Sequence, residues 1–185
     1  MDELSKELKE LEELKNIISQ LDGMGEMDFE TYDFTNFKIK TKFTNNSNNA
    51  DPEYAKLGDS GFDIRANINE PIILKPLERV LVPTGLRFEL TPNTELQIRP
   101  RSGMALKHGI SVLNTPGTVD EGYRGEVGII AVNLSNEEYT IQPGERIAQG
   151  VIMNVVGQGI SELVKVNDLS TSERGNDGFG STGKG

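Results

Sequence analysis

The sequence contains no cysteine, no tryptophan and a single histidine, His108. Without cysteine there is no disulfide framework, thiolate zinc site or cysteine nucleophile, and one histidine excludes a histidine-based metal cage. Any metal ion must therefore be held by oxygen atoms. No apolar run approaches the length that spans a bilayer, and the N-terminal residues lack the apolar core of a signal peptide. We therefore expect a cytoplasmic protein with no membrane segment.

Negative charge is concentrated at the N-terminal end of the chain. Residues 1–30 contain three Lys and ten Asp or Glu residues, so they carry a net charge of −7 out of −10 for the whole sequence. An acidic protein binds nucleic-acid backbones poorly, so we expect no nucleic-acid partner. A polyanionic ligand would have to be attracted by a few focused arginine side chains and a cation.

The 185 residues are enough for one ordinary domain with appendages at its ends. Leucine and isoleucine recur at three- and four-residue steps through residues 2–21, which predicts an amphipathic helix that ends near Asp22 and Gly23. The residues up to 36 show no periodicity and are predicted to form a linker. The Gly- and Ser-rich C-terminal end is predicted to be a flexible arm. The predicted division of the chain is 1–35, 36–171 and 172–185.

Short apolar runs, separated by proline and glycine, fill the region between these ends. Strict alternation begins in residues 37–43, where Phe37, Ile39, Thr41 and Phe43 share one face. Further runs are PIIL at 71, RVLV at 79, LRFEL at 86, ELQI at 95, VGIIAVNL at 127 and IAQGVIM at 147. Short strands at this spacing, without helical patterns between them, predict an all-β fold, an antiparallel sandwich or jelly roll.

Two polar segments in this region could carry chemistry, and each also has a plain structural explanation. In PRSGMALKHG, residues 100–109, an arginine, a hydroxyl and exposed backbone amides could bind phosphate, or the segment could be a polar turn with His108 in it. In NTPGTVDEGYRGEVG, residues 114–128, we expect a hairpin with Asp120 and Tyr123 at its turn. Asp120 is either a general base aimed at a water molecule or a solvated turn residue.

Two further segments follow. GERIAQG, residues 144–150, could be a turn leading into a buried strand, with Gln149 as an ordinary polar side chain. RGNDGFGSTG, residues 174–183, combines glycines with an arginine, a phenylalanine and two hydroxyls, which suit a flexible lid that clamps phosphates and stacks on a base. A disordered linker would not explain the single phenylalanine between glycines.

GDSGFDIRA from residue 58, PRSGMALKHG from 100, GTVDEGYRGEV from 117, GERIAQ from 144 and RGNDGFGSTG from 174 resemble, in order and spacing, the five motifs of the trimeric dUTPase family. The resemblance covers roughly residues 37–183. The resemblance implies a β jelly roll that assembles as a homotrimer. It also implies an enzyme that uses Mg²⁺ to hydrolyse dUTP to dUMP and pyrophosphate, which removes dUTP from the nucleotide pool and supplies dUMP for dTMP synthesis. Each active site would be built at subunit interfaces and closed by the C-terminal arm of a neighbouring subunit.

The resemblance also implies roles for individual residues. Asp120 would be the catalytic base, and Asp63 would act through Mg²⁺-bound water or by fixing an arginine. Tyr123 would pack on the deoxyribose so that a 2′-hydroxyl clashes. Uracil would be read by the backbone around Thr118, Val119 and Gly128, helped by Asn114. The phosphates would be held by Arg101, Ser102, Gly103 and Gln149. On the arm, Arg174 would approach the terminal phosphate and Phe179 would cover the uracil, with the clamp completed by Gly180, Ser181 and Thr182.

Two other interpretations stay open. The dCTP deaminases share several of these motifs but carry a catalytic glutamate on the strand after the hairpin, whereas VGIIAVNL, residues 127–134, contains no carboxylate. The second alternative is a non-catalytic interaction protein, in which the acidic N-terminal helix would offer a docking surface to an unidentified protein partner. An intact Asp120 and a complete arm favour catalysis.

Overall fold

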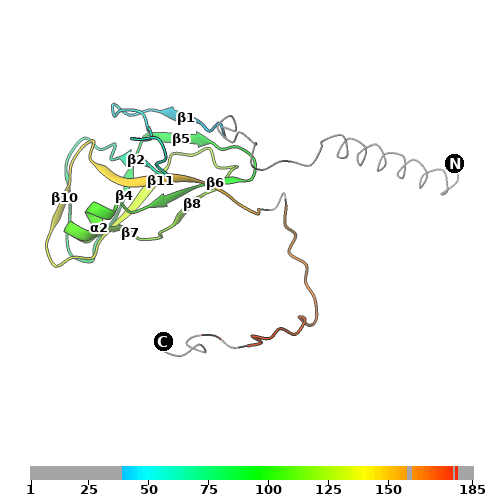
Figure 1. Ribbon diagram of the computed structural model, residues 1–185. Coiled ribbons are helices and arrows are strands. Elements are labelled where there is room, and N and C mark those ends of the chain that lie inside the picture. Colours follow the sequence, from blue (N-terminus) through cyan, green and yellow to red (C-terminus); the bar gives the residue numbers. More distant parts are fainter. Residues whose placement is uncertain (1–38, 158–159, 177, 179–185) are drawn as a thin grey trace. The chain divides into compact units, whose positions relative to one another are not determined.

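The computed structural model describes residues 39–157, 160–176 and 178 (Figure 1). Within these residues the chain consists mainly of short strands, and one helix stands between the sixth and seventh strands. The elements are β1 Lys42–Asn45, β2 Phe62–Arg65, β3 Ile72–Leu74, β4 Arg79–Pro83, β5 Leu86–Glu89, β6 Thr94–Arg99, α2 Ser102–His108, β7 Ile110–Val112, β8 Gly117–Val119, β9 Gly128–Asn133, β10 Tyr139–Ile141 and β11 Arg146–Asn154. The helix predicted for residues 2–21 lies outside the described residues.

The strands pair antiparallel in two larger and two smaller sheets. The larger sheets have the orders β2-β11-β6-β8 and β4-β9-β7, and the smaller ones pair β1 with β5 and β10 with β3. The predicted all-β, antiparallel character is therefore confirmed, with α2 as an addition that the sequence pattern did not predict. No helix within the described residues is long and apolar enough to cross a membrane.

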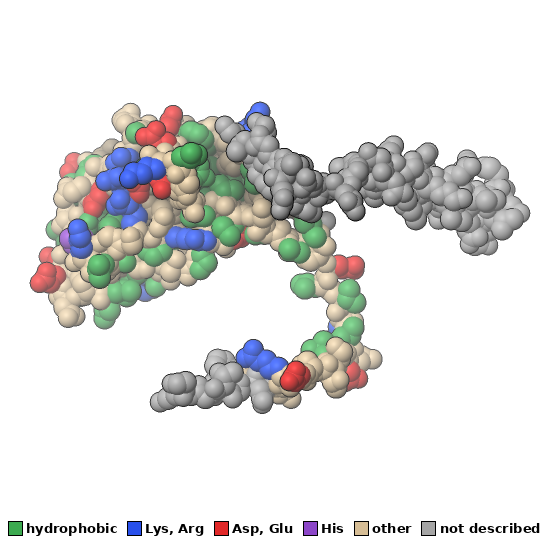
Figure 2. Space-filling model, in the orientation of Figure 1, with side chains coloured by type: hydrophobic (Ala, Val, Ile, Leu, Met, Phe, Trp, Pro, Cys, Tyr) green, Lys and Arg blue, Asp and Glu red, His purple; other side chains and the backbone are tan. Residues whose placement is uncertain are grey.

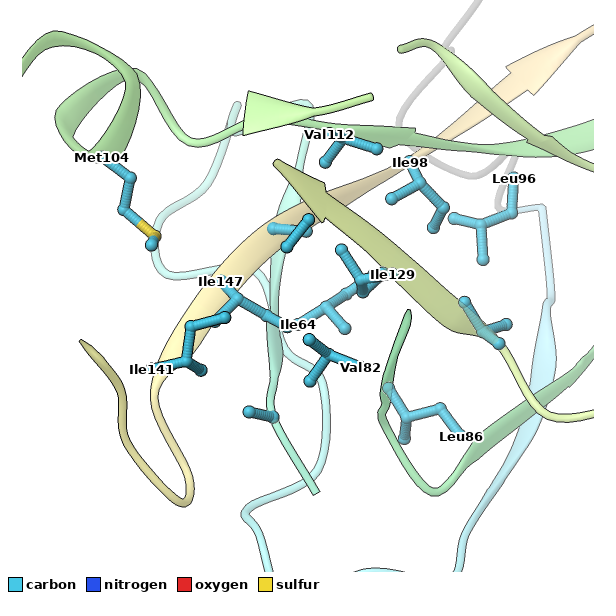
Figure 3. Packing of buried hydrophobic residues seen from close by; sticks show 14 of the residues in the cluster. Ile64, Val82, Leu86, Leu96, Ile98, Met104, Val112, Ile129, Ile141 and Ile147 are labelled. Atoms are coloured by element: carbon cyan, nitrogen blue, oxygen red, sulfur yellow. The ribbon is translucent and has the colours of Figure 1, made fainter. Parts of the chain in front are cut away.

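One hydrophobic core is shared by the two larger sheets. In β6 the residues alternate strictly, with Thr94, Leu96 and Ile98 buried and the polar residues between them half-buried. This alternation leaves one polar face on the four-stranded sheet and turns the other face to the core. Figure 3 shows side chains of the two sheets directed toward one another, with these labelled members: Ile64, Leu96, Ile98, Val82, Val112 and Ile129.

The six apolar runs that follow residue 70 form β3, β4, β5, β6, β9 and β11, as predicted. Of the alternating run predicted for residues 37–43, residues 37 and 38 lie outside the described residues, and β1 begins at Lys42. Its partner β5 ends at Glu89, which pairs with Lys42. Beyond that point the carbonyl of Lys40 accepts a hydrogen bond from the Thr91 hydroxyl at 2.9 Å instead of a ladder bond. Ile39, which precedes β1, and Phe43, which lies within it, are both 40% exposed.

Helix α2 replaces the polar turn considered for residues 100–109. It buries only Met104, so its seven residues show no apolar stripe from which a helix could be recognised. Gly109 ends the helix with φ 65° and donates its N–H to the carbonyls of Ala105 and Met104, as expected for a left-handed glycine cap. His108 is therefore the last helical residue rather than a turn residue, and its ring centroid lies 5.0 Å from that of Tyr139.

The predicted hairpin of residues 114–128 is not formed. Its two strands lie in different sheets, because β8 pairs with β6 while β9 pairs with β4 and β7. The connection between them is bound to the turn between β4 and β5: the Glu126 carboxylate accepts the N–H groups of Thr84 and Gly85, at 3.1 and 2.8 Å. The N–H of Val127 donates to the Leu86 carbonyl at 2.8 Å. These bonds draw the chain away from β8 before β9 begins.

Candidate active site

Asp63 joins two arginines that come from different parts of the chain. Its Oδ1 accepts a hydrogen bond from Nε of Arg101 at 2.7 Å, and its Oδ2 accepts one from Nη1 of Arg146 at 3.1 Å. Nη1 of Arg101 also donates to the main-chain oxygen of Arg146 at 3.1 Å. We call these three residues the Asp63 cluster. On the face shown in Figure 2, Lys and Arg side chains gather over β2 and β11 with acidic side chains among them.

Gln149 lies beside this cluster on the polar face of the four-stranded sheet. It pairs in register with Asp63 on β2 and with Arg99 on β6. Its Nε2 donates to the main-chain oxygen of Pro100 at 2.9 Å. Across the pairing with β2, a Cβ built on Gly61 would be only 2.6 Å from Oε1 of Gln149. Because Gly61 has no side chain, the Gln149 amide has space to lie against it.

Ser102 and Gly103 are the first two residues of α2, directly after Arg101. The first N–H groups of a helix have no intrahelical acceptor, so they can donate to an anion. A Cβ on Gly103 would meet nothing within 4 Å, so a ligand can approach this main chain closely. Ser102 and Gly103, which are predicted to bind phosphate, thus directly follow Arg101 of the Asp63 cluster.

The turn that leads into β11 is held in place by side chains that the sequence did not point to. Tyr139 donates a hydrogen bond from its hydroxyl to Oε1 of Glu145. Burial, followed by this bond, raises the pKa of Tyr139, so the hydroxyl stays protonated and remains the donor. Glu145 also accepts the N–H of Gln142 at 2.8 Å, and Nη1 of Arg65 donates to the Gly144 carbonyl at 3.0 Å. The next residue along the chain is Arg146.

Arg146 was missed as a site residue although it lies in GERIAQG, three residues before Gln149. Position within a strand does not show whether an arginine is paired, so its contact with Asp63 became visible only in the structure. Tyr139 and Glu145 gave no sequence signal, since a tyrosine and a glutamate around a Pro-Gly turn are common at protein surfaces.

A pocket of about 190 Å³ lies between the end of β8 and the start of β9. It is lined by Thr118, Val119, Asp120, Tyr123, Glu126, Val127 and Gly128. Five predicted site residues therefore line one pocket: those expected to bind uracil or deoxyribose, except Asn114, and Asp120, the expected catalytic base. Asn114 is not among the lining residues; it lies beside Gly117, whose Cβ would be 3.1 Å from Asn114 Nδ2.

Within this pocket Asp120 and Tyr123 are held by main-chain bonds. The Tyr123 N–H donates to the Asp120 carbonyl at 3.0 Å, and the Tyr123 hydroxyl donates to the Glu126 carbonyl at 3.0 Å. Gly125 lies directly against the tyrosine, because a Cβ built there would overlap the ring and the hydroxyl of Tyr123. Both Asp120 and Tyr123 are exposed, so they are accessible to a ligand.

The pocket and the Asp63 cluster lie apart in one chain. Val119 pairs with Leu96 on β6, while Gln149 pairs with Arg99. Asp120, one residue beyond Val119, is therefore at the level of Glu95, and four residues along a strand correspond to about 13 Å. None of the Asp63 cluster residues lines the pocket.

On the predicted arm, the structure describes Arg174 but not the residues after Gly178. Arg174 lies in a turn in which Gly175, with φ 51°, donates its N–H to the carbonyl and the hydroxyl of Ser172, both at 3.1 Å. The predicted positions Phe179, Gly180, Ser181 and Thr182 lie outside the described residues.

A protein-held metal cage is absent from the part of the chain that the structure describes, where no three His, Cys, Asp or Glu side chains come together. Asp63 uses one lone pair of each oxygen for an arginine, and a carboxylate has about four acceptor positions. The free positions can accept hydrogen bonds from metal-bound water. This donor set suits a hydrated Mg²⁺ carried by a ligand's phosphates, because Mg²⁺ usually retains several waters.

The comparisons with known proteins agree on one family. A family model described as dUTPase matches residues 47–183. The deoxyuridine 5′-triphosphate nucleotidohydrolase of Fusobacterium nucleatum subsp. nucleatum is 57% identical over 133 residues, which are 72% of this chain and 89% of that protein. The same enzyme of Cytophaga hutchinsonii is 56% identical over 149 residues, 80% of this chain and 95% of that protein.

A solved structure resembles the described chain at lower identity. The dUTPase of Staphylococcus bacteriophage 80alpha, solved with dUPNHPP, superimposes with a TM-score of 0.69 at 27% identity, and the match covers 78% of this chain and 99% of that one.

Proposed function

Since the chain belongs to the dUTPase family and is therefore a dUTP nucleotidohydrolase, we propose that Asp120 is the base that activates the attacking water. Water attacks phosphorus, the bond between the α- and β-phosphates breaks, and the products are dUMP and pyrophosphate. The enzyme would thereby remove dUTP from the cytoplasmic nucleotide pool. The observation that carries the proposal is the pocket that Asp120 lines together with Thr118, Val119 and Gly128.

The pocket supports selection of uracil and of deoxyribose. Main-chain N–H and C=O groups at the ends of β8 and β9 would read the uracil edge, and cytosine would present an amino donor where uracil has an acceptor. A site that leaves buried polar groups unpaired discriminates by about 10⁴ to 10⁵. The Tyr123 ring, fixed by its hydroxyl bond to Glu126, would pack on the deoxyribose and exclude a 2′-hydroxyl.

The polyphosphate would be bound by Arg101, Ser102, Gly103 and Gln149. Arg146 belongs with them, since Asp63 holds it next to Arg101. Because the cluster contains two arginines and one carboxylate, it keeps a net positive charge for an anionic ligand. Bound to the phosphates, Mg²⁺ would neutralise part of their negative charge. We propose that Asp63 contributes by orienting the two arginines and by accepting hydrogen bonds from metal-bound water.

We further propose a homotrimer with shared sites on a jelly-roll fold. The separation of pocket and Asp63 cluster in one chain supports this, since a second copy that brought its cluster to the first chain's pocket would complete a site. An apolar row supports contact between copies: Leu81 pairs with Ile130, which is followed across the sheet by Leu113, and the two leucines are 65% and 50% exposed. Arg174 and the arm of a further copy would close the site.

Three parts of the sequence prediction stand as they were. The division of the chain at residues 35 and 171 is retained as a proposal. So are the roles of Phe179, Gly180, Ser181 and Thr182 on the arm, and the protein partner for the N-terminal segment.

One assay tests the proposed function. The purified protein is incubated with Mg²⁺ and, separately, with dUTP, dCTP, dTTP or UTP, and pyrophosphate and ammonia are measured. We expect pyrophosphate from dUTP and almost none from the other nucleotides. Comparable turnover of UTP would contradict the role of Tyr123, and ammonia from dCTP would identify a deaminase instead.

A further inference from the structure

Glu121, the residue after Asp120, makes a contact outside the pocket. Its Oε2 accepts a hydrogen bond at 2.9 Å from the main-chain N–H of Asn93, in the turn between β5 and β6. Asn93 has φ 61°, a left-handed conformation in which asparagine is one of the few residues tolerated. The turn therefore fixes the direction of the Asn93 N–H group that donates to Glu121.

The same residue binds the beginning of the segment that leads to the arm. The carbonyl of Asn93 accepts the N–H of Val155 at 2.9 Å, and Val155 follows the last residue of β11. The N–H group and the carbonyl group of Asn93 thus connect two parts of the chain. These are the turn with Asp120 and the segment that begins at Val155 after β11. Asn93, Asp120, Glu121 and Val155 also line one common pocket.

The turn that contains Asn93 is restrained by hydrogen bonds of its own. Thr94 is 2% exposed, and both its N–H and its hydroxyl donate to the Thr91 carbonyl, at 3.2 and 2.6 Å. Between them lies Pro92, whose ring fixes its own φ. A shift of Val155 would therefore move Asn93 together with this turn, and the Glu121 carboxylate would pass the shift to the turn that carries Asp120.

We infer that Glu121 is a positioning residue that ties the Asp120 turn, through Asn93, to Val155, the first residue of the segment that leads from β11 to the C-terminal arm. The inference rests on the proposed role of Asp120 as the base. A base that has lost its restraint samples orientations in which the water is out of reach, and a misplacement of about 1 Å costs up to roughly 10²-fold in rate. Ground-state binding of uracil and phosphates uses other residues, so the effect falls on kcat.

The Glu121 side chain can be changed without disturbing the rest of the turn. Arg124 is bonded to the main-chain oxygens of Glu121 and Tyr123, at 2.6 and 3.0 Å, rather than to the carboxylate. Glu121 is also exposed, and exposed substitutions have small effects on stability. A loss of turnover in a Glu121 variant would accordingly report on position and not on unfolding.

The test compares Glu121→Ala, which removes the acceptor, with Glu121→Gln, which retains a side-chain oxygen. Asn93→Gly is the matched control, because glycine keeps the N–H, the carbonyl and the positive φ. Steady-state kinetics with dUTP give kcat and KM, and amide hydrogen exchange reports the bonds at Asn93 and Val155 directly. The exchange measurement needs no activity, so it tests the connection even if the proposed function fails.

We expect Glu121→Ala to lower kcat by about tenfold with KM within twofold of wild type, and to speed exchange at both Asn93 and Val155. Glu121→Gln and Asn93→Gly should match the wild type in kinetics and exchange. The inference is overturned if Glu121→Ala keeps the wild-type kcat, if exchange speeds at Asn93 but not at Val155, or if Glu121→Gln is as impaired as the alanine variant. Failure of the wild type to hydrolyse dUTP would instead contradict the proposed function.

Discussion

Gly61 and Gln149 are packed so closely that a Cβ on Gly61 would lie 2.6 Å from Oε1 of Gln149. In Gly61→Ala the Gln149 amide must therefore shift from this position, and dUTP binding should weaken. We expect KM for dUTP to rise about three- to tenfold, the range for the loss of one ordinary hydrogen bond. A double-mutant cycle provides the control: adding Gly61→Ala to Gln149→Ala should have no further effect on KM. A full additional loss would show that Gly61 acts elsewhere.

Replacing Asp63 by asparagine should disturb both arginines of the Asp63 cluster at once. The amide group would present a donor to one guanidinium, so that arginine would lose its partner. We expect KM for dUTP to rise about tenfold while the melting temperature changes little, since the cluster is partly exposed to solvent. The matched control is Glu89→Gln, which breaks the exposed 2.6 Å ion pair with Lys42. Equal effects of the two substitutions on KM would contradict the assignment.

Gly125→Ala should impair the distinction between dUTP and UTP. The new methyl group would occupy the position of the Tyr123 ring, which would have to leave the place where it excludes a 2′-hydroxyl. The ratio of kcat/KM for dUTP to that for UTP should therefore fall. Tyr123→Phe retains the ring and loses only the bond to Glu126, so it should retain most of the discrimination. If both variants discriminate as well as the wild type, the ring does not select the sugar.

A chain ending at Ser172 lacks Arg174 and Phe179, so it should remain trimeric but be nearly inactive. Mixed with full-length Asp120→Asn subunits, it should regain activity, because one chain then supplies Asp120 and another supplies the arm. The mixture is compared with each variant alone after mixed trimers have been verified by native mass spectrometry. Mixed trimers without activity would contradict sites shared between chains.

Sequence patterns predicted the strands with clear apolar content, from β3 to β6 and again β9 and β11. They did not predict β2, β7 or β10, because each of these short segments contains only two apolar residues and shows no period. Helix α2 was missed for a related reason, since a helix that buries only Met104 has no stripe. The hairpin prediction was wrong because the Glu126 carboxylate accepts hydrogen bonds from the N–H groups of Thr84 and Gly85, more than forty positions away, which a local pattern does not reveal.

For the site, the spacing of the sequence motifs indicated which residues act in the same reaction, but it did not indicate which of them are in contact. The pocket around Asp120 was predictable because its residues are close in sequence. The contact of Asp63 with Arg146 spans 83 positions, and the bond from Asn93 to Glu121 spans 28. Such contacts follow from sheet order and register, which the sequence alone did not give for β2, β8 and β11.

Turnover by Asp120→Asn tests the central claim most directly. The variant should bind dUTP with near-normal affinity in calorimetry and retain the wild-type circular dichroism spectrum, because Asp120 is exposed and the other residues that line the pocket are unchanged. Its kcat for dUTP should fall by about 10² to 10⁴, the usual contribution of a general base. A folded, dUTP-binding Asp120→Asn variant with near-normal kcat would show that another group activates the water.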